Sequence, residues 1–281
     1  MFDKLAHSWE LVKASATVLD ADRKLLLFPL LSTICTLLVA ASFFVPILVA
    51  GGLGDAPRDS MPMWFWVTMF VFYVIQYTVI FFFNTALVGT ALMRMDGGEP
   101  TFADGLRVAM ARLPAILGYA VIAATVGMIL RMLQERAGFI GRWIVGLLGV
   151  AWTVATFLTV PVLVSQNVGP IDAVKRSAEL LKQTWGENLA GNIGMGLVFG
   201  ILIAIVAFGG IALVIAAASA DAKMLGIAIM VLAVIGVMLL ALVQAALQGI
   251  YSAALYRYAT TGDAAGGFDQ ALIADAFHVK A

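Results

Sequence analysis

The sequence predicts an all-α, polytopic membrane helix bundle with six transmembrane helices and three amphipathic helices on the cytoplasmic side. Apolar residues make up 62% of the 281-residue chain and charged residues only 12%. A soluble domain carries about 25% charged residues. The charges also leave six long runs of the chain free, so water is not the main solvent of this fold.

Each charge-free run is long enough to cross a bilayer as a helix. A spanning helix needs about 20 mostly apolar residues, because the hydrocarbon core is about 30 Å thick. A transmembrane barrel would show short stretches of alternating polarity, whereas Met224 to Leu242 is continuously apolar. The runs are 25–54, 60–93, 113–130, 143–171, 188–220 and 224–256.

The basic residues predict the orientation. With the amino terminus in the cytoplasm, twelve Lys and Arg residues lie inside and five lie outside. The positive-inside rule then places both termini in the cytoplasm, and we expect the protein in a bacterial-type inner (plasma) membrane.

The cytoplasmic segments carry apolar stripes at helical spacing, which predict three amphipathic helices. In the second, Thr101 and Asp104 have the spacing of a capping box, and Gly97-Gly98 supplies the turn before it. The stripes are Phe2, Leu5, Trp9, Val12, Ala16 and Leu19; Phe102, Leu106, Met110 and Leu113; and Ile171, Val174, Ala178 and Leu181.

These helices have two interpretations that are compatible with each other. They can lie at the membrane surface with basic residues toward anionic headgroups, or they can pack on neighbouring helices and cap the bundle. The candidate interfacial positions are Phe2, Trp9, Lys13, Arg107, Arg112, Lys175 and Arg176.

Each amphipathic helix precedes two spans, a pattern compatible with a threefold repeat of one amphipathic helix and two spans. We therefore describe the chain as a single membrane domain, 1–281, with units 1–98, 99–169 and 170–260. A tail, 261–281, follows and contains a short amphipathic stretch from Phe268 to Phe277.

Both ends of the sequence resemble a known family. The opening Met1-Phe2-Asp3-Lys4-Leu5 through Ser8-Trp9-Glu10-Leu11-Val12-Lys13, the stretch Asp22-Arg23-Lys24-Leu25-Leu26-Leu27-Phe28-Pro29-Leu30, and the ending Ala254-Leu255-Tyr256-Arg257-Tyr258-Ala259-Thr260-Thr261-Gly262 with Phe268-Asp269 are similar to the DUF6159 family. The resemblance implies a bacterial or archaeal multi-pass membrane protein of unknown function. It implies no catalytic residues.

Uncharged polar residues inside the spans are candidates either for a polar cavity or for hydrogen bonds between helices. The candidate intramembrane polar positions are Gln76, Asn84, Asn192, Gln244, Gln248 and Ser252. Small residues at four-residue spacing let helices approach closely. The candidate helix-packing positions are Gly196, Gly200, Ala241, Ala245, Gly249 and Ala253. Pro46, Pro114 and Pro161 are positions where a span can kink or end.

Catalysis and nucleic-acid binding are disfavoured. His7 and His278 lie at opposite ends and Cys35 is the single cysteine, so neither a Cys/His metal site nor a Cys-His nucleophile is expected. The net charge of zero gives no basic footprint for nucleic acid. We expect no cofactor and no enzyme activity.

The expected role is structural, regulatory or lipid-associated. The alternative is a channel or permease for a small neutral or lipidic solute. The expected partners are membrane lipids, and protein partners or further copies of the chain stay open.

Overall fold

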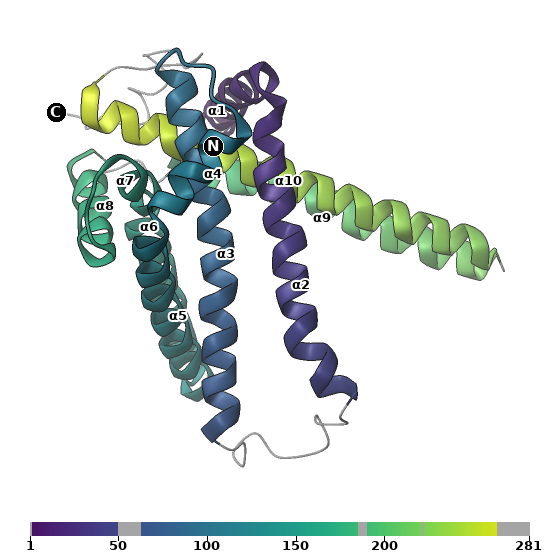
Figure 1. Cartoon of the computed structure of the whole chain (residues 1–281). Helices are drawn as coiled ribbons and strands as arrows, with labels where there is room; N and C mark the ends of the chain where they lie inside the picture. Colours follow the sequence, from purple (N-terminus) through teal and green to yellow (C-terminus); the bar gives the residue numbers. More distant parts are fainter. Residues whose placement is uncertain (1, 50–62, 185–189, 221, 263–281) are drawn as a thin grey trace. The chain divides into compact units, whose positions relative to one another are not determined.

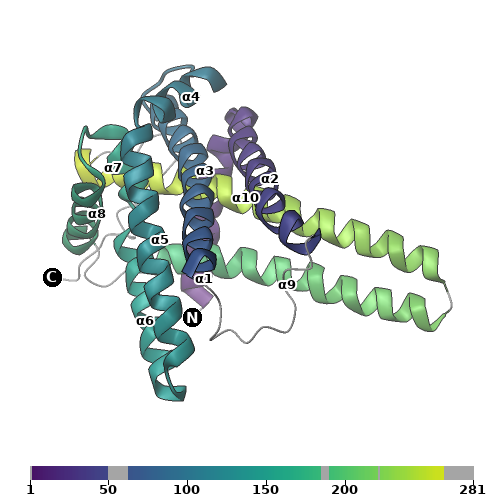
Figure 2. The same ribbon diagram turned by 60° about the horizontal axis from the view of Figure 1, so that its bottom comes forward.

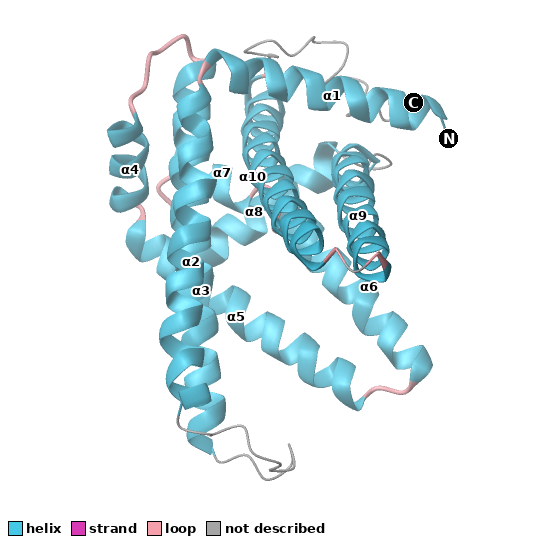
Figure 3. Cartoon of the chain, turned by 90° about the vertical axis from the view of Figure 1, so that its right-hand side faces the viewer, coloured by secondary structure: helices cyan, strands magenta, loops and turns pink. Residues whose placement is uncertain are grey.

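In a computed structural model the protein is built from α-helices (Figures 1 and 3). The structure describes residues 2–49, 63–184, 190–220 and 222–262, with side chains described from residue 12 onward except at 183–195 and 197. No strand occurs within these ranges. The predicted tail from Phe268 to Phe277 lies outside the described residues.

The described part of the chain contains the following helices. They are α1 (Phe2–Ala21), the 3-10 turn η1 (Arg23–Leu26), α2 (Leu27–Val49), α3 (Met63–Met95), α4 (Phe102–Ala111), α5 (Leu113–Arg136), α6 (Phe139–Ala155), α7 (Thr159–Ser165), α8 (Pro170–Thr184), α9 (Ala190–Ser219) and α10 (Lys223–Thr261).

Six stretches of the described chain are helical, long and apolar enough to cross a membrane, which confirms the predicted spans. They are Arg23–Val49, Met63–Met95, Leu113–Arg136, Phe139–Ser165, Val198–Ser219 and Lys223–Thr261. Pro46 lies inside α2, and Pro114 lies in the first turn of α5, where its missing N–H costs no helical hydrogen bond.

The helices form two compact units. One consists of residues 27–183, and the other combines the two ends of the chain, residues 1–26 and 184–281. The single-domain description and its division into 1–98, 99–169 and 170–260 remain predictions.

The core of the unit 27–183 is concentrated at one end of its spans. In α3 the buried run is Thr85–Ala91, near the carboxyl end of the helix, and in α5 the buried residues lie between Ile116 and Ala124, near the amino end. Because α3 and α5 are packed together, these stretches lie at the same end of the two spans. The helix pair α5 and α6 extends from it (Figure 2), and α6 has no buried residue.

In the other unit, α9 and α10 form a hairpin, and α1 packs on both. The first half of α10 exposes large apolar side chains, including Met224 and Leu232, whereas its residues from Ala246 to Tyr256 are buried except for Gln248. At about 1.5 Å per residue, its 39 residues extend about 58 Å, well beyond a 30 Å hydrocarbon core. The helix ends at Gly262, whose φ of 76° is a left-handed cap that glycine adopts without strain.

Candidate functional site in the docked surface helices and the broken fourth span

The helix α4 docks on α3 through small residues. Gly105 and Ala109 are buried in the contact, and a Cβ at Gly105 would collide with Thr90 Oγ1 and come within 3.0 Å of the Ala86 carbonyl oxygen. On the α3 side, Gly89 lies against Val108 in the same way. The contact therefore has no room for a side chain at Gly105 and little room for one at Gly89.

This docking rotates α4 away from the predicted stripe. Phe102 does face inward and stacks on Phe28 with ring centroids 4.8 Å apart. Leu106 is only half-buried, however, and Met110 is 58% exposed. Small residues occupy the centre of the contact because they allow the backbones to approach, and the large apolar residues are left at its flank.

The helix α8 is arranged similarly. Its buried positions include Ala173 and Ser177, both fully buried, and Leu180 and Leu181. Ile171 begins the predicted stripe but is 59% exposed. The stripe is again shared between a face toward the protein and an exposed flank.

The helix α1 shows the same kind of buried face, with Val12, Ala14, Ser15 and Val18 inside and Lys13 exposed. The side chains of Phe2 and Trp9 lie outside the described residues. In all three surface helices, small residues that the apolar stripes did not include are therefore at or near the centre of the contact.

Basic side chains lie beside the exposed apolar flanks. On α4, Arg107 is exposed and lies three residues before Met110, so the two are neighbours on the helix surface. Arg107 forms an ion pair with Asp104 at 2.9 Å. On α8, Lys175 and Arg176 are exposed, and Arg176 lies 3.7 Å from Glu179. Each of these two helices thus exposes an apolar residue together with basic residues.

Arg112 has a different environment from the other predicted interfacial arginines. One guanidinium nitrogen, Nη1, donates to Asn167 Oδ1 at 2.5 Å, and Nη2 lies 3.4 Å from the Val164 carbonyl oxygen. Arg112 thus joins the start of α5 to the end of α7.

The predicted capping box is present. Asp104 N–H donates to Thr101 Oγ1 at 3.3 Å, and Thr101 N–H and Oγ1 both donate to Asp104 Oδ2, at 2.9 and 2.7 Å. These hydrogen bonds, with a smaller contribution from Arg107, lower the pKa of the Asp104 carboxyl below its ordinary value. The preceding turn uses Gly97 at a φ of 84°.

The fourth span is broken between α6 and α7. The backbone leaves the α-helix at Thr156, Phe157 and Leu158, and Pro161 lies in the first turn of α7. Proline has no N–H and cannot donate the usual bond to the carbonyl four residues earlier. The break separates a helix with no buried residue from one that is buried from Thr159 to Leu163.

Polar side chains from two other helices meet this break. Ser177 of α8 accepts a hydrogen bond from the Leu158 N–H through its Oγ at 3.0 Å. The Tyr119 hydroxyl of α5 interacts with the hydroxyls of Thr156 and Thr159. The sequence signal for this site was Pro161, because the polar residues around it are individually ordinary.

Predicted polar residues of the second span lie on α3. Gln76 and Asn84 are half-buried, and Gln76 Oε1 is buried without a hydrogen-bond partner. On the same helix Tyr73 accepts a hydrogen bond from Arg131 at 2.8 Å, and Arg131 also donates to Glu135 at 3.2 Å. Sequence reasoning did not single out Tyr73 or Tyr119.

The remaining polar candidates belong to α9 and α10. Ser252 is buried and donates to the Gly249 carbonyl at 2.8 Å, Gln244 is half-buried, and Gln248 is exposed. The side chain of Asn192 lies outside the described residues. The structure thus assigns Gln76 and Asn84 to one unit and Gln244 and Gln248 to the other.

Only some of the small residues predicted at helix contacts are buried. Gly249 and Ala253 are buried, whereas Ala241 and Ala245 are exposed. A Cβ at Gly196 or Gly200 would meet nothing within 4 Å. The close contacts between α9 and α10 are made at Gly210, where a Cβ would lie 2.6 Å from that of Ala233, and at Gly236 against Val206.

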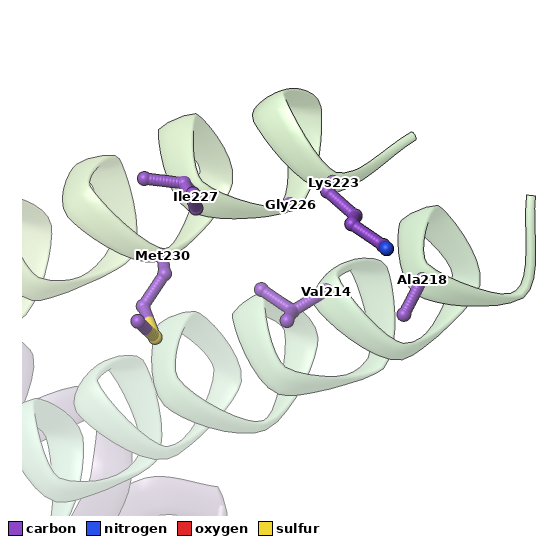
Figure 4. Close-up of a pocket in the computed structure, with 6 residues that line it drawn as sticks. All are labelled: Val214, Ala218, Lys223, Gly226, Ile227 and Met230. Atoms are coloured by element: carbon purple, nitrogen blue, oxygen red, sulfur yellow. The ribbon is translucent and has the colours of Figure 1, made fainter. Parts of the chain in front are cut away.

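A shallow apolar hollow of about 210 Å³ lies where α9 ends and α10 begins (Figure 4). Its lining is Val214, Ala218, Lys223, Gly226, Ile227 and Met230. The Lys223 side chain extends from α10 toward the end of α9 (Figure 4) and is the one charged group in this lining.

Six helices with this length and composition define a multi-pass membrane protein. A family model described as a family of unknown function, DUF6159, matches residues 63–267. The chain belongs to this family, which confirms the resemblance seen in the sequence. A comparison with curated proteins and one with solved structures gave no match.

Proposed function

We propose that this is a non-enzymatic protein of the inner membrane, with both termini in the cytoplasm, that binds anionic lipid through α4 and α8. One observation carries the proposal: each helix docks on its unit by small residues and keeps an apolar side chain exposed near basic ones. Met110 with Arg107, and Ile171 with Lys175 and Arg176, form these flanks.

The two exposed flanks suit a membrane surface better than water. An apolar side chain gains by entering the boundary between headgroups and acyl chains, and a nearby basic group then meets anionic headgroups. Each Lys or Arg near such a surface contributes about 1 kcal/mol. The two interpretations of the sequence, packing and lipid contact, thus apply to different faces of one helix.

The test is retention of phosphatidylglycerol by the purified protein in mixed micelles, measured by native mass spectrometry. A variant with Arg107→Gln, Lys175→Gln and Arg176→Gln should lose affinity by on the order of 100-fold at low salt, from about 1 kcal/mol per charge. The matched control is Arg136→Gln with Arg142→Gln. These two arginines are exposed and lie in the last turn of α5 and the first turn of α6. Equal retention in all three proteins would reject the proposal.

Vesicles containing the same protein test the alternative role as a path for a small neutral or lipidic solute. If that role is correct, Gln244→Leu with Gln248→Leu abolishes flux of glycerol or of a labelled lipid. Vesicles that pass neither molecule would exclude these solutes and leave lipid binding as the supported role.

A further inference from the structure

Hydroxyl groups from α5 and from both sides of the break come together in the fourth span. Tyr119 is only 4% exposed and interacts with Thr156 and Thr159. Thr156 Oγ1 donates to the Trp152 carbonyl at 2.8 Å. Thr159 is fully buried, and its hydroxyl makes no close, well-aligned hydrogen bond.

A further hydroxyl, from Thr85 of α3, lies on the helix face that meets this region. The Phe81 ring stacks on Tyr119 with centroids 4.4 Å apart, and Thr85 lies one turn further along the same face of α3. The helices α3 and α7 are in contact. Thr85 is fully buried, and its Oγ1 has no hydrogen-bond partner.

Other threonines of the spans show what is unusual about this pair. Thr78 and Thr90 of α3 donate to the carbonyls of Val74 and Ala86, four residues earlier, at 2.7 and 2.8 Å. Thr85 makes no such bond, and Thr159 lies just after the break, where the regular ladder is interrupted. The Thr85 hydroxyl therefore has no acceptor within the described chain, and the Thr159 hydroxyl has only its interaction with Tyr119, which is not a close hydrogen bond. Leaving such groups unsatisfied in a low-dielectric interior is costly.

We propose that the break binds a small neutral guest whose oxygen accepts hydrogen bonds from Thr85 and Thr159. The guest is a water molecule or the hydroxyl or carbonyl group of a small organic molecule. It is neutral because the groups around it, Tyr119 and Thr156 among them, are uncharged, and a buried anion needs a countercharge. A cation would use the hydroxyl oxygens but leave their hydrogens without an acceptor. This site is separate from the lipid-binding flanks of α4 and α8.

The sign of a stability change tests the proposal. Valine has the shape of threonine without its hydroxyl, so Thr85→Val and Thr159→Val should each lower the melting temperature by removing a bond to the guest. The melting temperature of the double variant should be no lower than that of the less stable single variant, because the first change already releases the guest. A rise in melting temperature in both single variants would overturn the proposal, since deleting an unsatisfied buried hydroxyl stabilises a protein.

The control variants are Thr78→Val and Thr125→Val, whose hydroxyls bond to carbonyls of their own helices. Their melting temperatures should change less than those of the site variants. Equal decreases at all four positions would also contradict the proposal, because they would reflect a general effect of valine in these spans.

Radiolytic footprinting of the unmodified protein in nanodiscs identifies the guest, because hydroxyl radicals arise from bound water. Tyr119 should be labelled while Tyr251, which is 1% exposed in the other unit, is not. Labelling that disappears in Thr85→Val supports water. Lowered melting temperatures without labelling of Tyr119 support the hydroxyl or carbonyl of an organic guest.

Discussion

Single residues decide how the surface helices are held. Ser177 is fully buried on α8 and accepts the hydrogen bond of the Leu158 N–H at the break. The backbone of the fourth span does not supply an acceptor for this N–H, because the chain is not helical at residues 156–158. A side chain on one element thus completes the backbone hydrogen bonding of another.

Ser177→Ala should destabilise the protein by about 1–3 kcal/mol, because the buried Leu158 N–H is left without its acceptor. The measurement is equilibrium unfolding in detergent. Ser165→Ala, at an exposed position on α7, is the control and should change the free energy of unfolding by less than about 0.5 kcal/mol. Similar free energies for both variants would show that the bond contributes little.

The Asp104 carboxylate should make the amino end of α4 sensitive to acid. Its pKa in the folded state is lowered, chiefly by hydrogen bonds from Thr101. The stabilisation is therefore complete above the ordinary aspartate pKa of about 3.9 and is lost as the pH falls through the lower, folded value. Hydrogen-exchange protection of the α4 amides should fall in that acid range in the native protein and stay flat in Asp104→Asn. Parallel profiles would contradict this assignment.

Sequence reasoning succeeded at this scale where the chemistry is local. The capping box and the Gly97 turn were predicted because their hydrogen bonds connect residues within a few positions of each other. The bond from Arg112 to Asn167 was not predicted, since these residues are far apart in the chain and a basic residue near a span end is also suited to lipid. The stripes of α4 and α8 missed the centres of the buried faces, Gly105 and Ser177, because apolar size was taken as the measure of burial, whereas the stripe residues Val12 and Leu19 of α1 are buried.

At the scale of elements, the close contact of α4 with α3 depends on the absence of a side chain. Gly105→Ala should destabilise the protein by about 1–3 kcal/mol through overpacking. The new methyl group would meet Phe28 Cζ at 2.6 Å and the Ala86 carbonyl at 3.0 Å, and the carbonyl cannot move away.

The matched variant is Gly146→Ala in α6, where nothing lies within 4 Å of the added methyl group. There alanine should be neutral or stabilise the helix by up to about 1 kcal/mol. Unfolding in a graded detergent mixture measures both. A stable Gly105→Ala protein would mean that α4 can shift away from α3.

The broken span shows the limit of hydropathy at this scale. Residues 143–171 were predicted as one run without charge, and hydropathy does not distinguish a straight helix from two helices with an irregular joint. Pro161 gave the only local signal. The polar contacts that complete the joint come from α5 and α8, which is information about packing.

At the scale of the whole molecule, the six spans were predictable because the cost of placing charges in hydrocarbon is large and leaves a plain mark on the sequence. The association of α1 with α9 and α10 was not predictable. These elements are separated by most of the chain, and an apolar stripe does not specify its partner.

The proposed orientation rests on the distribution of basic residues and can be tested with single cysteines. In a Cys35→Ser background, Gln134→Cys near the outer end of α5 should react with a membrane-impermeant maleimide in right-side-out vesicles. Glu99→Cys, before α4, should react only after the membrane is opened. Both residues are exposed, so the reversed pattern would place the termini outside.

The uninterrupted course of α10 has a mechanical consequence. Its first half packs on α9, where Gly236 lies against Val206, and its second half is largely buried and packs on α1. One rotation of the helix about its axis must therefore suit both contacts. One residue inserted after Leu242 would turn the two halves against each other by about 100°, and four residues would leave a mismatch of only about 40°. Because an unbroken helix turns as one piece, its contact with α9 and its contact with α1 together fix the rotation of α10 about its axis, and a one-residue insertion must break one of them.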